Sequence, residues 1–229
     1  MMNTFKYMAP ASRAELHGLL ADHGGAAKLL AGGTDLLGDI RIGLAWPELV
    51  VDLKKVDGFA DVTWSPNEGL TIGPAVTIND VLRDPRIREH YPLLVACARD
   101  LASHQIRNRA TVVGNIMNAS PCSDMAPGLL CLGARTVISS ARGRREIALV
   151  DLFTGVKETV LEADEVLEAI AIRNPRTMEA LNEVMEDYPW RMNQFGRQIV
   201  DALRARIQAG LLISLGPLRT GRSGKRTSK

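Results

Sequence analysis

A short segment at residues 31–37, Ala-Gly-Gly-Thr-Asp-Leu-Leu, combines residue types that could bind a phosphate group. Gly32 and Gly33 follow an apolar run that predicts a buried strand, so they stand where a strand ends. Without side chains, their backbone can turn with positive φ and present N–H groups directly to an anion. Thr34 can add a hydroxyl donor, and Asp35 is expected to cap the helical turn that follows.

A second segment makes this interpretation stronger. It begins at Thr111 with Thr-Val-Val-Gly-Asn and continues through a run rich in hydroxyl, amide and small residues at 118–127. A glycine pair alone commonly marks only a turn. A second glycine-containing segment with hydroxyl and amide side chains favours a ligand site, because such groups can share hydrogen bonds to phosphate oxygens. Together the two segments predict two halves of one phosphate clamp.

The composition is that of an ordinary globular chain. It has 229 residues, of which 46% are hydrophobic and 24% charged, which suits one large or two small domains. No run approaches the roughly 18 to 20 apolar residues of a membrane span, and the first residues lack the apolar stretch of a signal peptide. Three cysteines without a C-x-x-C pair and four scattered histidines predict reduced thiols and no metal site. We therefore expect a cytoplasmic protein.

The net charge of +2 conceals an uneven distribution. Residues 1–172 carry 17 Lys and Arg against 21 Asp and Glu, whereas residues 173–229 carry 11 against 5. The last residues, 217–229, are polar, basic and rich in glycine, so we expect them to be disordered. Because no aromatic residues interleave with these charges, a nucleic-acid partner is not expected.

Hydrophobic spacing predicts a small α/β lobe over residues 1–55. Residues 12–23 place leucines on one helical face, with Ser12 as the N-cap and two glycines as the stop. Short strands are expected at 28–31 and 49–53, one on each side of the first glycine segment.

The pattern then changes to an α+β lobe over residues 56–172. Two short apolar segments flank Ser-Pro-Asn-Glu-Gly, which predicts a hairpin turn. A basic segment at 142–145 predicts another turn between later strands. The expected helices lie at 77–82, 91–101 and 124–132, and the expected strands at 62–64, 70–72, 136–140, 146–149 and 165–172.

Five spaced motifs give the chain a family resemblance. They are Lys-Leu-Leu-Ala-Gly-Gly-Thr-Asp at 28–35, Gln-Ile-Arg-Asn at 105–108, Thr-Val-Val-Gly-Asn at 111–115, Ser-Pro-Cys-Ser-Asp at 120–124 and Asp-Leu-Phe-Thr-Gly at 151–155. Over residues 3–172 the chain resembles the FAD-binding medium subunit of molybdenum hydroxylases, a family that includes the flavin subunits of xanthine dehydrogenase, carbon monoxide dehydrogenase and 4-hydroxybenzoyl-CoA reductase. The resemblance implies an α+β, two-lobed FAD-binding fold of the vanillyl-alcohol-oxidase-like type.

The resemblance also implies FAD as the cofactor and assigns its contacts residue by residue. The backbone of the first glycine segment would hold the pyrophosphate, beside a strand that lines the cofactor. Asp124 would contact the cofactor from the second segment, and Leu167 would approach the flavin ring from the last strand. No residue is expected to act as a catalytic acid or base, because the redox chemistry belongs to the flavin. The implied FAD-binding residues are Lys28, Leu29, Leu30, Ala31, Gly32, Gly33, Thr34, Asp35, Thr111, Val112, Val113, Gly114, Asn115, Asp124 and Leu167.

Two departures from the family pattern carry expectations of their own. Val113 stands where the family usually has glycine. If its amide approaches the pyrophosphate with positive φ, a β-branched residue there is strained and FAD binding is weakened. Residues 173–216 predict an atypical helical tail in place of the family's C-terminal domain.

These observations favour an electron-transfer subunit. The resemblance implies that FAD accepts electrons from a small subunit with 2Fe-2S clusters and passes them to NAD or another acceptor, while a large subunit with a molybdenum cofactor oxidises the substrate. The sequence has no iron–sulfur cysteine set, which agrees with that division. Two alternatives stay open: a degenerate homologue that acts as a binding or assembly module without FAD, and a stand-alone FAD oxidase.

Overall fold

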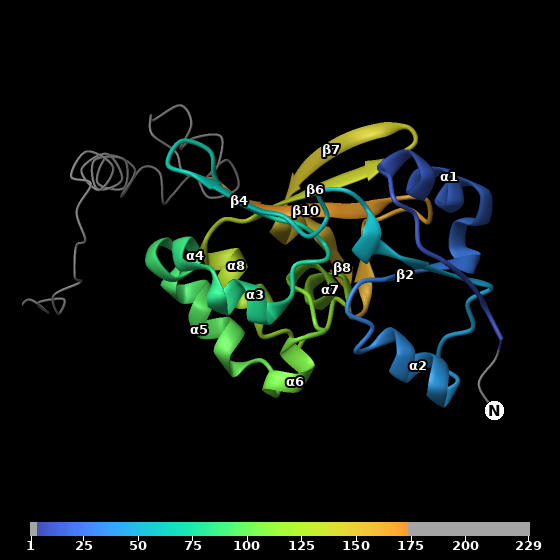
Figure 1. Ribbon diagram of the computed structural model, residues 1–229, viewed down its shortest axis with the longest axis horizontal. Helices are drawn as coiled ribbons and strands as arrows, with labels where there is room; N and C mark the ends of the chain where they lie inside the picture. Colours follow the sequence, from blue (N-terminus) through green and yellow to red (C-terminus); the bar gives the residue numbers. More distant parts are fainter. Residues whose placement is uncertain (1–3, 174–229) are drawn as a thin grey trace, which may run out of the picture. The chain divides into compact units, whose positions relative to one another are not determined.

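The computed structural model describes residues 4–173, which form two main sheets with flanking helices (Figure 1). The strands of the three-stranded sheet lie within residues 6–52, and those of the five-stranded sheet lie within residues 62–172. The expected lobe boundaries at 55 and 172 stay a prediction. Apart from Arg173, the expected helical tail at 173–216 and the basic segment at 217–229 lie outside the described residues.

The three-stranded sheet is parallel and comes from the first part of the chain. Its strands are β1 (Lys6–Met8), β2 (Ala27–Leu30) and β3 (Leu49–Asp52), in the order β1-β3-β2. Helix α1 (Arg13–His23) connects β1 to β2, and α2 (Leu36–Ile42) connects β2 to β3. Because the strands are parallel, their carboxyl ends lie at one edge of the sheet, where ligands commonly bind in α/β folds.

Helix α1 forms as the sequence predicts. The Ser12 side chain accepts a hydrogen bond from the N–H of Glu15 at 3.2 Å, which caps the helix. Leu16 and Leu20 lie on one face and are buried in a cluster with residues of β3. Strand β1 was not predicted, because its three residues are all exposed and give no apolar pattern. Its extended conformation comes from pairing with β3.

The five-stranded sheet is antiparallel, in the order β4-β5-β10-β6-β7. The predicted hairpin of the first two strands is confirmed. The basic segment 142–145 was expected to be a turn, but β7 begins at Gly143, so Arg144 and Arg145 lie in the strand. Charged side chains are accommodated there because β7 is an edge strand. The strands are β4 (Val62–Ser65), β5 (Gly69–Ile72), β6 (Arg135–Ser140), β7 (Gly143–Ala148) and β10 (Val166–Ile172).

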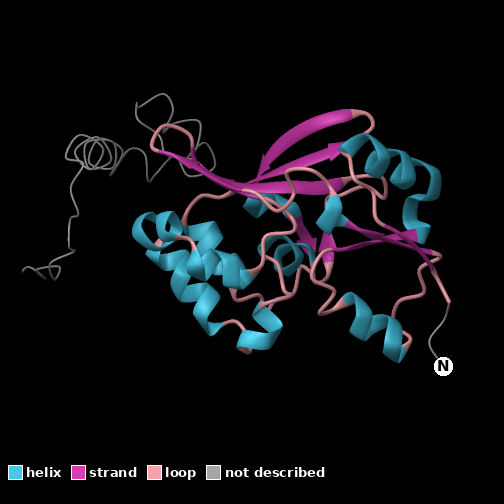
Figure 2. Ribbon diagram, viewed as in Figure 1, coloured by secondary structure: helices cyan, strands magenta, loops and turns pink. Residues whose placement is uncertain are grey.

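A group of short helices covers one face of the five-stranded sheet (Figure 2). The main core lies between these helices and the sheet, and it is built mainly from aliphatic residues of the helices and of β5, β6 and β10. The helices are α3 (Ile78–Arg83), α4 (Pro85–His90), α5 (Pro92–Asp100), α6 (His104–Arg107), α7 (Val112–Met117) and α8 (Met125–Cys131). Short 3₁₀ helices lie at Gly24–Ala26, Leu53–Lys55 and Leu149–Leu152, and a two-stranded ribbon is formed by β8 (Phe153–Gly155) and β9 (Glu158–Thr159).

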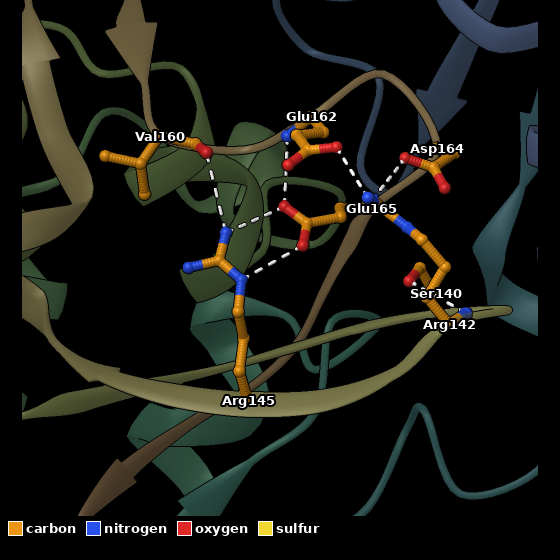
Figure 3. Close-up of polar contacts among 7 residues, drawn as sticks. All are labelled: Ser140, Arg142, Arg145, Val160, Glu162, Asp164 and Glu165. Atoms are coloured by element: carbon orange, nitrogen blue, oxygen red, sulfur yellow. Dashed lines mark hydrogen bonds and ion pairs between the residues drawn. The ribbon is translucent and has the colours of Figure 1, made fainter.

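Ion pairs tie the edge strand β7 to the turn before β10 (Figure 3). Arg145 donates through Nε and Nη2 to the two carboxylate oxygens of Glu165, at 3.0 and 2.8 Å. Arg142 pairs with Glu162 and Asp164, each at 2.8 Å. The bonds from Arg145 hold the pKa of Glu165 below its usual range, so this carboxylate is ionised at neutral pH. The network anchors the start of β10.

Candidate functional site

Residues 31–35 join β2 to α2 at the carboxyl edge of the three-stranded sheet, and we call this segment the glycine loop. Among the described residues, the backbone N–H groups of Gly32, Gly33, Thr34 and Asp35 find no acceptor. Thr34 and Asp35 are exposed, and the two glycines are half-buried. Neighbouring N–H donors that the protein leaves unpaired beside water are the groups that bind phosphate oxygens in other loops.

Both glycines of the loop are required by the local geometry. Gly33 has a φ of 76°, a left-handed conformation that other residues rarely adopt. A Cβ atom on Gly32 would lie 2.1 Å from the carbonyl oxygen of Arg109. No side chain fits in that space, so only glycine lets the glycine loop touch the backbone just before Thr111. The structure thus brings the two sequence segments side by side.

The second segment is a short helix and not a loop. Helix α7 begins after Thr111, whose Oγ1 accepts a hydrogen bond from the N–H of Gly114 at 3.0 Å. Val112 and Val113 are buried in the main core, and Val113 is not among the positive-φ residues of the described chain. The expected strain at Val113 is therefore wrong, because a valine in a first helical turn has ordinary dihedral angles. Neither valine side chain can meet a ligand.

Asn115 positions the loop that follows α7. Its Oδ1 accepts a hydrogen bond from the hydroxyl of Ser123 at 2.6 Å and from the N–H of Met125 at 3.4 Å. The same loop carries Asp124, which is exposed and finds no hydrogen-bond or ion-pair partner within residues 4–173. The Oδ1 atom of Asn115 therefore bonds to the protein itself. The carboxylate of Asp124 has no such partner among the described residues and can accept a hydrogen bond from a ligand.

A series of polar contacts runs from the glycine loop to the β8–β9 turn. The carboxylate of Asp35 accepts from Thr34 Oγ1 at 3.3 Å and from Asn118 Nδ2 at 3.2 Å. Asn118 Oδ1 in turn accepts from Lys157 Nζ at 2.6 Å. Asp35 was expected to cap α2, but it makes no capping bond, because its backbone is already helical, with ψ of −55°, where a cap requires an extended residue. The carboxylate links the two segments instead.

The remaining predicted residues lie on strands and are mostly buried. Leu30 is 8% exposed and packs with Ile40 and Val50. Leu167 is 2% exposed and lies on β10 beside a bulge. Leu29 is half-buried, and Lys28 is exposed. The buried leucines can line a cofactor through their backbone but offer little side-chain surface.

Three residues near the glycine loop were not among the predicted FAD-binding residues. Asn118 and Lys157 reach it through Asp35, and Lys54 donates to the carbonyl oxygen of Ala31 at 3.2 Å. Lys157 stands two residues after the Asp-Leu-Phe-Thr-Gly motif, so its place beside that motif could have indicated it as a site residue. Lys54 has no local signal, since its contact depends on how the strands pair.

The donors of this site suit a large phosphate-containing ligand, because backbone N–H groups and amides bind oxyanions. Within residues 4–173 no group of three or more His, Cys, Asp or Glu side chains could hold a metal ion. No helix in this part of the chain is long and apolar enough to cross a membrane.

Comparison with known proteins finds related domains and subunits. Residues 3–175 match the family model described as the FAD binding domain in molybdopterin dehydrogenase. The carbon monoxide dehydrogenase medium chain of Hydrogenophaga pseudoflava is 34% identical over 170 residues, which are 73% of this chain and 58% of that protein. The xanthine dehydrogenase FAD-binding subunit of Escherichia coli O157:H7 is 36% identical over 169 residues, or 74% and 58%.

Solved structures agree with the sequence matches. The quinoline 2-oxidoreductase of Pseudomonas putida 86 superposes with a TM-score of 0.73 at 32% identity, over 76% of this chain and 61% of that chain. The chain therefore spans less than two thirds of the length of the relatives it matches.

Proposed function

Because the chain belongs to the family of FAD-binding domains of molybdopterin dehydrogenases, we propose that it binds FAD at the glycine loop and serves as the electron-transfer flavoprotein subunit of a molybdenum hydroxylase complex. The observation that carries this proposal is the row of N–H groups from Gly32 to Asp35 that find no acceptor within residues 4–173. The contact between Gly32 and Arg109 sets this row against the second segment. A phosphate-containing cofactor of this family would satisfy those donors.

In this proposal the chain binds and orients the cofactor without covalent chemistry. The N–H groups of Gly32–Asp35 would donate to the pyrophosphate oxygens, and the N–H of Val113, which has no acceptor among the described residues, would add a donor from α7. The Asp124 carboxylate would accept from a hydroxyl or ring N–H of the cofactor. By the family resemblance, Leu167 would lie near the flavin ring. FAD supplies the redox chemistry when bound, so no side chain is needed as an acid or base.

We further propose that the flavin exchanges electrons with other subunits. Two relatives are named a medium chain and an FAD-binding subunit, words that describe one part of an assembly. By analogy, electrons would arrive from a small 2Fe-2S subunit and leave to NAD or another acceptor, while a large molybdenum-cofactor subunit oxidises the substrate. A two-lobed fold of the vanillyl-alcohol-oxidase-like type, with lobes at 1–55 and 56–172, belongs to the same proposal.

A homologue without FAD is not favoured. One of the two arguments for it is backbone strain at Val113, and the helical conformation of α7 removes that argument. The other, the atypical sequence after residue 172, lies almost wholly outside the described residues. The chain keeps the glycine loop and an accessible Asp124, which are the features that FAD binding would use.

The test is the flavin content of the purified protein and of two matched glycine variants. We expect stoichiometric FAD in the wild type and loss of FAD in Gly33→Val, because φ of 76° and nearby Leu30 and Leu37 side chains leave no unstrained place for valine. Gly38→Val, in a helix with open space around its Cβ, should keep its FAD.

Circular dichroism establishes that each variant is folded, and Gly33→Ala replaces the valine variant if that one does not fold. A wild type that takes up no FAD contradicts the proposed function. A folded Gly33 variant with full FAD content contradicts the glycine loop as the phosphate site. Co-purification with iron–sulfur and molybdenum proteins tests the proposed partners separately.

A further inference from the structure

Asp52, the last residue of β3, is one of the few charged residues buried in the described chain, with 5% of its surface exposed. Its carboxylate accepts a hydrogen bond from the hydroxyl of Tyr7 at 2.5 Å and from the N–H and Nζ of Lys54 at 3.0 and 2.6 Å. Burial alone would raise the pKa of Asp52, but the bonds from Lys54 and Tyr7 outweigh it and lower the pKa. The carboxylate is therefore ionised at neutral pH and holds Lys54 firmly.

The register of the parallel sheet brings this ion pair to the glycine loop. Leu30, the last residue of β2, pairs with Asp52, so the residue after each lies at the same edge. There Lys54 Nζ donates a second hydrogen bond, 3.2 Å long, to the carbonyl oxygen of Ala31. The Lys54 side chain is only one-third exposed, at 33%. The bond from Lys54 to Asp52 is partly buried, whereas its bond to Ala31 is exposed. The ammonium group makes both bonds charge-assisted, and such bonds are stronger than those between neutral groups.

Lys54 thereby controls the direction of one N–H group of the loop. The carbonyl of Ala31 and the N–H of Gly32 belong to one planar peptide, which is trans, so they point in opposite directions. Lys54 holds the carbonyl from one side, and the backbone of Arg109 lies against Gly32. Rotation of this peptide would break the hydrogen bond from Lys54, so that bond favours one orientation of the peptide. The unpaired N–H of Gly32 is therefore aimed before any ligand arrives.

We propose that Lys54, held by Asp52 and Tyr7, is a positioning residue for cofactor binding: it locks the peptide between Ala31 and Gly32 so that the glycine loop is preorganised for phosphate. This inference rests on the proposed function of the loop. A preorganised loop loses less conformational freedom on binding, which raises affinity without adding a contact. Lys54 also neutralises Asp52, which would otherwise place a buried negative charge close to an anionic ligand.

The experiment compares Lys54→Met with Lys55→Met, which removes the same charge from a neighbouring exposed lysine that has no side-chain partner within residues 4–173. A double variant, Asp52→Asn with Lys54→Met, removes both charges of the pair. FAD affinity is measured by flavin fluorescence on titration of each apoprotein. The amide signal of Gly32 is followed by two-dimensional nitrogen–proton NMR in the same apoproteins, without any ligand.

We expect Lys54→Met to weaken FAD binding by about tenfold, the effect of losing one charge-assisted hydrogen bond, and to move the Gly32 amide signal. Lys55→Met should do neither, and the double variant should stay as weak as Lys54→Met, because the Ala31 carbonyl is still unheld. Recovery of wild-type affinity in the double variant would overturn the proposal, since Lys54 would then act only by neutralising Asp52.

An unmoved Gly32 amide in Lys54→Met would overturn the proposal as well. If the wild type binds no FAD, the proposed function fails, and the Gly32 amide still decides whether Lys54 orients the loop.

Discussion

The two segments that meet at the candidate site use their backbones in opposite ways. In the glycine loop, the N–H groups of Gly32 to Asp35 are unpaired and partly exposed. In the second segment, Thr111 accepts the N–H groups of Gly114 and Asn115, and the valines between them are buried. The sequence motifs look like equal halves of a clamp. The structure makes the glycine loop the main surface of N–H donors, whereas the second segment mainly supports that loop and adds the N–H of Val113.

This difference shows where each kind of residue is needed. A donor surface requires glycine, because its backbone must turn with positive φ and approach both protein and ligand. A support requires apolar side chains, because its job is to fix a position through packing. Val113 is therefore suited to its place, and a glycine there would weaken the support.

The largest effect is expected for a change at the contact between the two segments. Gly32→Ala places a Cβ 2.1 Å from the backbone oxygen of Arg109, which cannot rotate away, so the segments must separate. We expect a loss of about 4 kcal/mol in the free energy of unfolding, near the upper end of single substitutions. Urea denaturation measures it. Gly18→Ala, in α1 with nothing near its Cβ, is the control and should be neutral or slightly stabilising.

Val113→Gly tests the support directly. Removing a buried side chain and placing glycine in a helix should cost about 3 kcal/mol of unfolding free energy. This reverses the expectation from the motif alone, in which glycine at this position relieves strain and tightens FAD binding. The matched control is Val156→Gly, at a valine that is 68% exposed in the β8–β9 turn. Equal stability of the two variants would mean that α7 does not depend on its buried face.

The sequence predicts most elements of the fold because their signals are local. Ser12 caps α1 and Ser-Pro-Asn-Glu-Gly forms the β4–β5 turn, as expected. The helix predicted at 77–82 is α3, and in the structure Thr77 and Asp80 form a reciprocal capping box at its start. Strand β1 gave no such signal, because its conformation comes only from its partner strand. The family resemblance is confirmed by the match over residues 3–175.

The site was harder to predict, for two physical reasons. A motif names residue types but not backbone conformation, so Thr-Val-Val-Gly-Asn predicts half of a phosphate clamp, although Thr111, Val112 and Val113 form a capped, buried helical turn. Contacts made by strand register leave no trace in the local sequence, which is why Lys54 beside Ala31 was missed. Asp35 shows both difficulties. Its backbone conformation prevents it from capping α2, and its carboxylate accepts a hydrogen bond from Asn118, which is far away in the sequence.

A smaller effect is expected at Asp124, in the loop after α7, where a substitution should change FAD binding and not folding. Asp124 is exposed and has no partner among the described residues, so Asp124→Ala should leave the unfolding free energy unchanged. FAD binding should weaken by roughly 1 to 3 kcal/mol, the range for losing a charged hydrogen-bond partner. Titration of apoprotein with FAD measures it, with Asp22→Ala, an exposed and equally unpartnered aspartate of α1, as the control. Unchanged affinity would remove Asp124 from the site.

The smallest effect concerns the side-chain hydrogen bond that joins the two segments directly, from Asn118 to Asp35. Asp35 accepts from Asn118 at 3.2 Å, and Asp35 is exposed, so the bond is weakened by water. A double-mutant cycle with Asp35→Ala and Asn118→Ala should give a coupling of about 0.5 kcal/mol in unfolding free energy. Asn118→Ala alone should cost more than Asp35→Ala, because it also releases Lys157.

The control cycle pairs Asp35→Ala with Asn67→Ala, at an exposed asparagine of the β4–β5 turn without a described contact, and it should be additive. If the Asp35–Asn118 cycle is additive too, the glycine loop is held to its support only through the backbone contact of Gly32 and the packing around it. In that case no side-chain hydrogen bond among the described residues would stabilise the glycine loop against the second segment. A coupling well above the expected value would instead mean that Asp35 belongs to the support.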